Sequence, residues 1–124
     1  MNDAEKSKMA RNICEKFIKG SYLVEDALAG GAVAITVPIL FVDRDYACFF
    51  VQCDDSGAVI ISDDGGIAFH QGLDAFAIKC ICQVHNLAFD EDGLGISKVC
   101  MREEAPDVLM SFFEAAIDSF SLMK

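Results

Sequence analysis

Three apolar runs separated by acidic turns occupy the middle of the sequence and constrain the fold more than any other feature. The runs cover Val33 to Val42, Tyr46 to Cys53 and Ala58 to Ser62, and their β-branched and aromatic residues favour strands. The connecting segments, Asp43-Arg44-Asp45 and Asp54-Asp55-Ser56-Gly57, suit turns because Asp bonds nearby backbone and Gly tolerates positive φ. This order predicts three consecutive antiparallel strands.

The details of these runs give three further expectations about the sheet. Pro38 cannot donate a ladder hydrogen bond, so the first strand is expected at an edge or with an irregularity. The second run is apolar on both faces, and we expect both faces to be buried. A four-residue loop between the second and third runs places Cys53 opposite Ala58 and Cys48 opposite Asp63.

Helical periodicity predicts three helices around this sheet. Asp3 to Lys19 and Asp74 to Leu87 each place apolar residues on one face, and Pro106 opens a helix that runs to about Leu122. Gly95 to Met101 is typical of a short fourth strand, and Tyr22 to Leu28 is ambiguous. We therefore predict a single α+β domain over the whole 124-residue chain. Its small antiparallel sheet, a three-stranded meander plus a fourth short strand, packs with an N-terminal, a middle and a C-terminal helix.

The last predicted helix has an unusually wide apolar face. Its polar residues fall on a narrow stripe, and apolar side chains fill roughly 200° of arc at the ideal helical repeat. Either the helix is sandwiched between the sheet and the first helix, or part of it is covered by another chain in a symmetric dimer. The residues expected at such an oligomer interface are Leu109, Met110, Phe113, Ile117 and Phe120.

The chain is strongly acidic, and this bears on its partners. It has 20 Asp and Glu against 10 Lys and Arg, a formal net charge of -10, which disfavours binding to a phosphate backbone. The charge is uneven, because residues 1–19 carry five basic and three acidic residues, whereas residues 20–124 carry five and seventeen. Such a surface attracts a basic partner protein or keeps an apolar chain soluble. We expect no nucleic-acid partner.

Membrane insertion, secretion and cofactor binding are not expected either. The longest uncharged stretch, Ala27 to Val42, has sixteen residues, fewer than the roughly twenty that span a bilayer. Six cysteines without an N-terminal apolar signal segment favour the reducing cytoplasm, where Cys packs as a small hydrophobe. Cys80-Ile81-Cys82 and His85 lack the spacing of a zinc site. We expect neither a metal nor another cofactor.

Acidic residues gathered by the hairpin supply the candidate site. Asp63 and Asp64 are expected near the Asp43-Arg44-Asp45 turn, which brings four carboxylates and one guanidinium together. Hard cations such as Mg²⁺ or Ca²⁺ need several oxygen ligands, so the cluster could hold one. It could also be an acidic patch for a partner, or a set of turn residues that bond local backbone N–H groups. His70 and His85 lie in no nucleophile motif, and no catalytic constellation is recognisable.

Three short segments resemble a known family. Ile35 to Ile39, Asp43 to Tyr46 and Ile61 to Gly65 resemble a bacterial and prophage-associated domain of unknown function, family number 1828. That family has a Thr-Pro-Phe strand, an acidic turn, a strand and a Thr-Asp-Asp-Gly motif before a helix. Here Val37 precedes the proline and Ser62 replaces the motif threonine. The resemblance implies no known reaction, but it implies a bacterial or phage cytoplasmic setting and favours a role for the Asp-Asp-Gly residues beyond a turn.

The sequence leads to three functional hypotheses. The first is a protein-interaction module of bacterial or mobile-element type that binds a partner through its acidic surface or its apolar last helix. The second is a metal-dependent hydrolase that acts through clustered Asp carboxylates. The third is a structural homodimer. Charge without catalytic groups favours the first, and its candidate partner-binding residues are Asp43, Arg44, Asp45, Asp63, Asp64 and Gly65.

Overall fold

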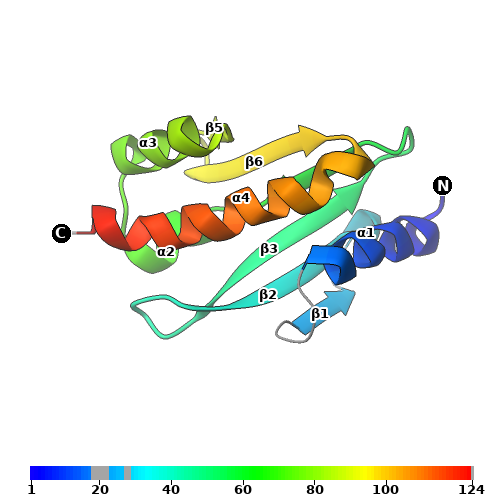
Figure 1. Ribbon diagram of the computed structural model, residues 1–124, viewed down its shortest axis with the longest axis horizontal. Coiled ribbons are helices and arrows are strands. Elements are labelled where there is room, and N and C mark those ends of the chain that lie inside the picture. Colours follow the sequence, from blue (N-terminus) through cyan, green and yellow to red (C-terminus); the bar gives the residue numbers. More distant parts are fainter. Residues whose placement is uncertain (18–22, 27–28, 124) are drawn as a thin grey trace.

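A single antiparallel sheet organises the fold (Figure 1). The computed structural model describes residues 1–17, 23–26 and 29–123, and the strands of these residues lie in the order β1-β2-β3-β4-β6-β5. The strands are β1 (Leu23–Asp26), β2 (Val33–Leu40), β3 (Tyr46–Cys53), β4 (Val59–Ser62), β5 (Ala88–Asp90) and β6 (Gly95–Cys100). The helices are α1 (Asp3–Phe17), α2 (Gly66–Gln71), α3 (Ala75–His85) and α4 (Ala105–Asp118), with short 3₁₀ helices η1 (Ala29–Gly31), η2 (Arg102–Glu104) and η3 (Ser119–Leu122).

The predicted α+β class is confirmed, but the sheet has six strands among the described residues rather than four. β1 forms in the ambiguous segment, and β5 forms between the third helix and the acidic loop. Both strands are short, and each forms through backbone pairing with one neighbouring strand. Leu23 of β1 pairs with Thr36 of β2, and Ala88 of β5 pairs with Ser97 of β6. α2, with six residues, is likewise too short to show helical periodicity. The predicted end of the first helix at Lys19 lies outside the described residues.

The predicted register of the β3–β4 hairpin is wrong by one residue. Cys53 pairs with Val59, one residue later than expected. The reason is that the Asp54 N–H donates to the carbonyl of the residue before Val59 at 2.9 Å and extends the ladder. The Asp54 carboxylate also accepts N–H bonds from within the loop, which tightens it. The expected pairing of Cys48 with Asp63 is lost as a result.

Pro38 sits at an irregularity, as the sequence predicts, but not on an edge strand. β1 pairs with β2 from Val33 to Thr36. The pairing of β2 with β3 then shifts register between Thr36 and Leu40. Pro38 lies within that shift, where an interrupted ladder tolerates its missing N–H.

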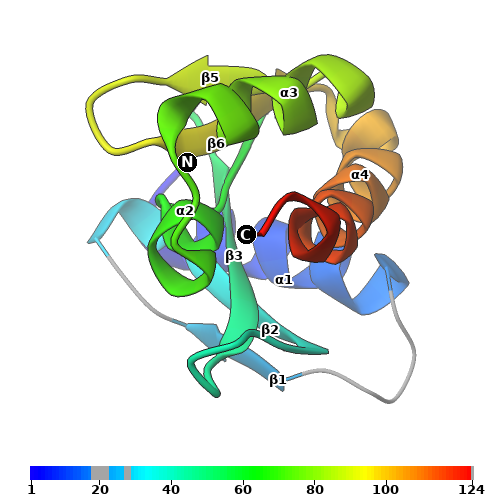
Figure 2. The same cartoon turned by 90° about the vertical axis from the view of Figure 1, so that its left-hand side faces the viewer.

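α1 and α4 lie on the same face of the sheet and contact each other (Figure 2). Alternate strand residues point into this layer, and Ile35 and Phe49 are completely buried there. α4 contributes Phe112, whose ring meets the Phe49 ring edge-on with 5.6 Å between centroids. The inward side chains of β2 and β3 thus pack with the apolar side chains of α4 in one core.

α4 is packed among other elements, yet part of its apolar face remains exposed. It contacts the sheet, α1 and α3, which is the sandwiched arrangement. Of the predicted interface residues, Leu109 is buried and Phe113 is half-buried. Met110, Ile117 and Phe120 are exposed on α4 and η3. Of the five residues predicted at an oligomer interface, three are thus exposed, Phe113 is partly accessible and Leu109 is not accessible.

The opposite face of the sheet is accessible, and the expectation that β3 is buried on both faces is wrong. The outward residues of β3 are exposed at Tyr46 and half-buried at Cys48, Phe50 and Gln52. β2 shows the same alternation between buried inward and accessible outward positions. Antiparallel sheets commonly have one core-facing side and one accessible side, and apolar outward residues hide this division in the sequence.

Candidate functional site

Three acidic turns lie at the same end of the sheet. The β2–β3 turn carries Asp43 and Asp45, the β4–α2 turn carries Asp64, and the β5–β6 turn carries residues 91–92 just after Asp90. Antiparallel order brings these connections to the same end, the left-hand end in Figure 1. Asp64 and Asp90 line one small cavity of about 90 Å³. We define the acidic end by its exposed carboxylates, which belong to Asp43, Asp45, Asp64, Asp90, Glu91 and Asp92.

Asp63 lies at this end of the sheet but points inward. It is 2% exposed, and its carboxylate accepts N–H bonds from Gly65 at 2.9 Å, from Ile96 at 2.8 Å and from Ile67 at 3.1 Å. Burial raises the pKa of Asp63, and the three N–H bonds act in the opposite direction. Through these hydrogen bonds the carboxylate connects the β4–α2 turn and α2 to β6, so its role is structural.

Backbone geometry explains the Ser-Asp-Asp-Gly sequence of the β4–α2 turn. The Ser62 hydroxyl accepts the Asp64 N–H at 2.9 Å, and Asp64 and Gly65 have φ values of 51° and 75°. A Cβ at Gly65 would lie 2.5 Å from the Gly93 carbonyl oxygen, so only glycine fits there. Asp64 is the one carboxylate of this turn that is exposed.

His70 of α2 is a site residue that sequence reasoning missed. Its Nδ1 lies 2.5 Å from Oδ2 of Asp43 and 3.5 Å from Oδ2 of Asp45. Its ring stacks on Phe41 with 5.8 Å between centroids and meets Phe69 edge-on at 5.1 Å. We name Asp43, Asp45 and His70 the Asp–His cluster. The sequence signal that could have suggested it is the position of a histidine on the element directly after the Asp-Asp-Gly turn.

The hydrogen bond with His70 lowers the pKa of Asp43 below its ordinary value. The Asp45 N–H adds a 3.1 Å bond to Oδ1 of Asp43, which also favours the charged form. Arg44, which the sequence places in this cluster, has a φ of 73° and an exposed side chain. Among the described residues, the bonded partner of Asp43 across the site is therefore His70.

A small cavity of about 180 Å³ opens beside the Asp–His cluster. Phe41, Tyr46 and Phe50 line it together with Asp64 and His70. Aromatic rings next to carboxylates suit a cationic side chain such as Lys or Arg. The three ligand atoms of the Asp–His cluster, all within 4.8 Å of one another, suit a divalent cation. The Asp–His cluster and the cavity beside it thus suit either a cationic side chain or a divalent cation.

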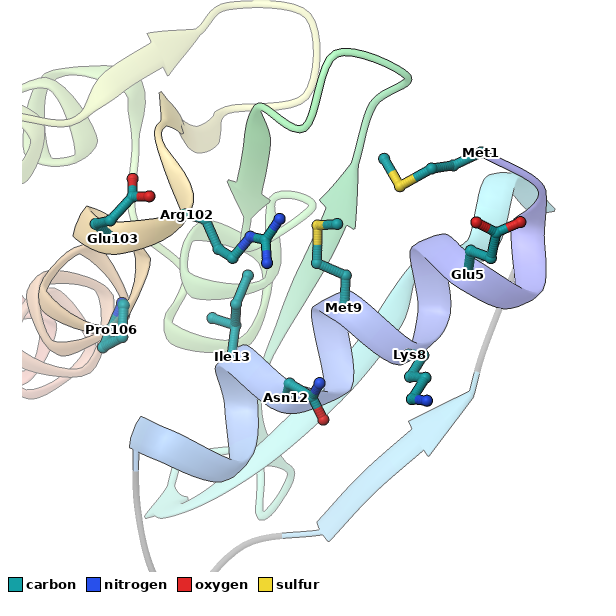
Figure 3. A pocket seen from close by; sticks show the side chains of 9 residues that line it. All are labelled: Met1, Glu5, Lys8, Met9, Asn12, Ile13, Arg102, Glu103 and Pro106. Carbon is teal, nitrogen blue, oxygen red and sulfur yellow. The ribbon is translucent and has the colours of Figure 1, made fainter.

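A larger groove of about 600 Å³ lies away from the acidic end, between α1 and η2 (Figure 3). Met9 and Ile13 of α1 lie near Arg102 of η2, while Glu5 and Glu103 lie at opposite ends of the groove. Its charged groups do not converge on a common point. The groove therefore offers no equivalent of the Asp–His cluster.

Comparison with known proteins gives no functional assignment. No protein-family model matches the chain, and no curated protein or solved structure matches it. The resemblance to family number 1828 stays a prediction. Among the described helices, none is long and apolar enough to cross a membrane.

Replacing Asp63 with Asn should destabilise the fold, because the amide NH₂ would face backbone N–H donors that the carboxylate now satisfies. We expect the free energy of unfolding to fall by about 2 kcal/mol, the scale of one unsatisfied buried group. The matched control is Asp64→Asn, since Asn tolerates positive φ and this side chain is exposed. Urea unfolding of both variants provides the comparison, and equal stability of the two would contradict the structural role of Asp63.

Replacing His70 with Ala should raise the pKa of Asp43 toward its ordinary value of 3.8, because the largest cause of its lowering is removed. The folded pKa lies below the unfolded one, so this contribution to stability is present above pH 3.8 and is lost as the pH falls through the folded pKa. NMR titration of the Asp43 carboxyl carbon measures the shift. His85→Ala is the control, because His85 bonds Asp118 instead. An Asp43 pKa unaffected by His70→Ala would refute the assignment.

Proposed function

We propose that this chain is a protein-interaction module that binds a basic segment of a partner protein through the acidic end. The observation that carries the proposal is the gathering of six exposed carboxylates from three turns at one end of the sheet. The same turns contribute a single basic residue, Arg44. A surface dominated by one sign of charge attracts partners of the opposite sign and speeds their association.

Aromatic side chains near these carboxylates support a protein ligand. Phe69 is 80% exposed and Tyr46 is 57% exposed, and such residues are enriched at binding surfaces. The cavity beside His70 has room for the end of one Lys or Arg side chain, whose aliphatic stem can contact the rings. The bacterial or phage cytoplasmic setting implied by the family resemblance remains part of this proposal.

The apolar last helix is the alternative surface for the same function. Met110, Ile117 and Phe120 are between 40% and 49% exposed, but their predicted neighbour Leu109 is buried. An interface made only by these three side chains would be small and apolar, and its strength would depend little on salt. Salt dependence therefore distinguishes the two surfaces.

Divalent-cation binding is a second candidate, favoured by the close approach of three ligand atoms in the Asp–His cluster. Two carboxylates and one imidazole suit Mn²⁺ or Zn²⁺ better than Ca²⁺. The predicted hydrolase used Asp63 as well, but that carboxylate already accepts three backbone N–H bonds. Of the predicted carboxylates, Asp43, Asp45 and Asp64 thus remain for a metal-dependent reaction, together with His70.

Affinity capture from host lysate tests the leading proposal. We expect the wild-type protein to retain one stoichiometric partner at low salt and to lose it at moderate salt, because exposed charges are screened. The triple variant Asp43→Asn, Asp45→Asn, Asp64→Asn should lose the partner at both salts. Its control removes three exposed carboxylates elsewhere, at Glu15, Glu103 and Glu114. Capture that is unchanged by the first triple variant would contradict binding at the acidic end.

Thermal melting with and without Mn²⁺ or Zn²⁺ tests the second candidate. Metal binding to the folded state should raise the melting temperature, and Asp45→Asn should abolish that rise while leaving the metal-free melting temperature nearly unchanged, since Asp45 is exposed. Asp107→Asn, an exposed acid on α4, is the control. Identical melting with and without either metal would remove this candidate.

A further inference from the structure

The accessible face of the sheet carries no charged side chain over its four central strands. Its outward positions are four in β2, four in β3, two in β4 and three in β6, and every one of these described residues is apolar or uncharged polar. The pairing of Lys98 with buried Ile61 places Lys98 on the core-facing side. Leu40, Tyr46 and Val99 are 47%, 57% and 65% exposed, and Phe50 and Ile60 lie half-buried between them. On a chain in which 24% of residues are charged, a contiguous charge-free face is a candidate contact surface, because such patches are often functional.

We propose that this face is the contact surface between two copies of the chain in a twofold dimer. A partner with a charged contact surface would bury its charges against groups that cannot neutralise them, which is costly. A second copy instead presents the same uncharged face, because a twofold axis places the same residues on both sides. Two sheets packed face to face can interdigitate their outward side chains. The acidic ends, which lie at the strand termini, stay in solvent.

The size of the face fits a weak dimer. Four strands about 4.8 Å apart and up to about eight residues long, at about 3.3 Å per residue, cover roughly 400 to 500 Å². Two such faces approach the lower bound of about 1,000 Å² for a specific interface. We therefore expect a weak dimer that dissociates into monomers as the protein concentration falls. It also differs in place from the interface predicted on the last helix.

Salt separates this dimer from binding at the acidic end. Each copy carries a net charge of -10, so the two copies repel each other over the rest of their surfaces. Raising the salt concentration screens this repulsion and strengthens an uncharged interface. Binding of a basic partner at the acidic end weakens under the same change. Tyr46 and Phe50 belong to both surfaces, but the opposite responses to salt let the two proposals fail independently.

Sedimentation velocity of the full chain over a range of protein concentrations, at low and moderate salt, tests the dimer. We expect the dimer fraction to rise with protein concentration and with salt concentration. Val99→Lys should lower the association constant by more than about tenfold, because it buries a charge in the interface. This substitution reduces the net negative charge, so any loss cannot come from added repulsion. Val84→Lys is the control, since Val84 is 74% exposed on α3 and should leave the dimer intact.

Leu40→Lys, on the same face, provides a second variant if Val99→Lys does not fold, as judged by its circular dichroism spectrum and melting temperature. A wild-type chain that stays monomeric at all concentrations would overturn the proposal. Full dimerisation of both folded face variants would overturn it too. Loss of the dimer in Val84→Lys alone would place the interface on the helices and equally contradict the sheet face.

Discussion

Backbone N–H groups from two segments of the chain converge on the buried carboxylate of Asp63. Gly65 and Ile67 belong to the β4–α2 turn and its helix, whereas Ile96 belongs to β6. A neutral side chain of similar size cannot accept all three bonds, and each unsatisfied buried donor costs free energy. The backbone around it is equally constrained, because Gly65 approaches the Gly93 carbonyl too closely for any Cβ. The position of α2, and therefore that of His70, depends on these hydrogen bonds to Asp63 and on the close approach at Gly65.

The fold separates charged from uncharged surface. The acidic turns lie at the ends of the strands, the helices α1 and α4 cover one face, and the outward side chains of the other face are uncharged over the four central strands. Asp63 is the exception among the acids of this end, since it is buried where three N–H groups stabilise it. Such a division lets one small chain present an acidic surface and an uncharged surface, which adjoin at Tyr46 and Phe50.

The sequence predicted the elements that carry their own pattern and missed those that do not. The long amphipathic helices and the three apolar runs follow from periodicity, and they define the α+β class. β1 and β5 exist because neighbouring strands supply their hydrogen bonds, which no local pattern records. The pairing of the hairpin led us to expect acidic residues together at this end, but the inward role of Asp63 and the contact of His70 with Asp43 depend on tertiary packing. Asp63 is buried and Asp64 is exposed. The sequence does not indicate this difference, because the two residues are adjacent and identical.

Amide hydrogen exchange of Ile96 and Ile67, followed by NMR, tests most directly whether the Asp63 carboxylate holds this end of the sheet together. Ile67 lies in the first turn of α2, where an N–H has no partner within the helix, so protection there reports on Asp63 itself. We expect both amides to exchange only through opening of large parts of the fold, with protection close to that of core strand amides such as Phe49. Rapid exchange of Ile67 and Ile96 beside a protected Phe49 would contradict it.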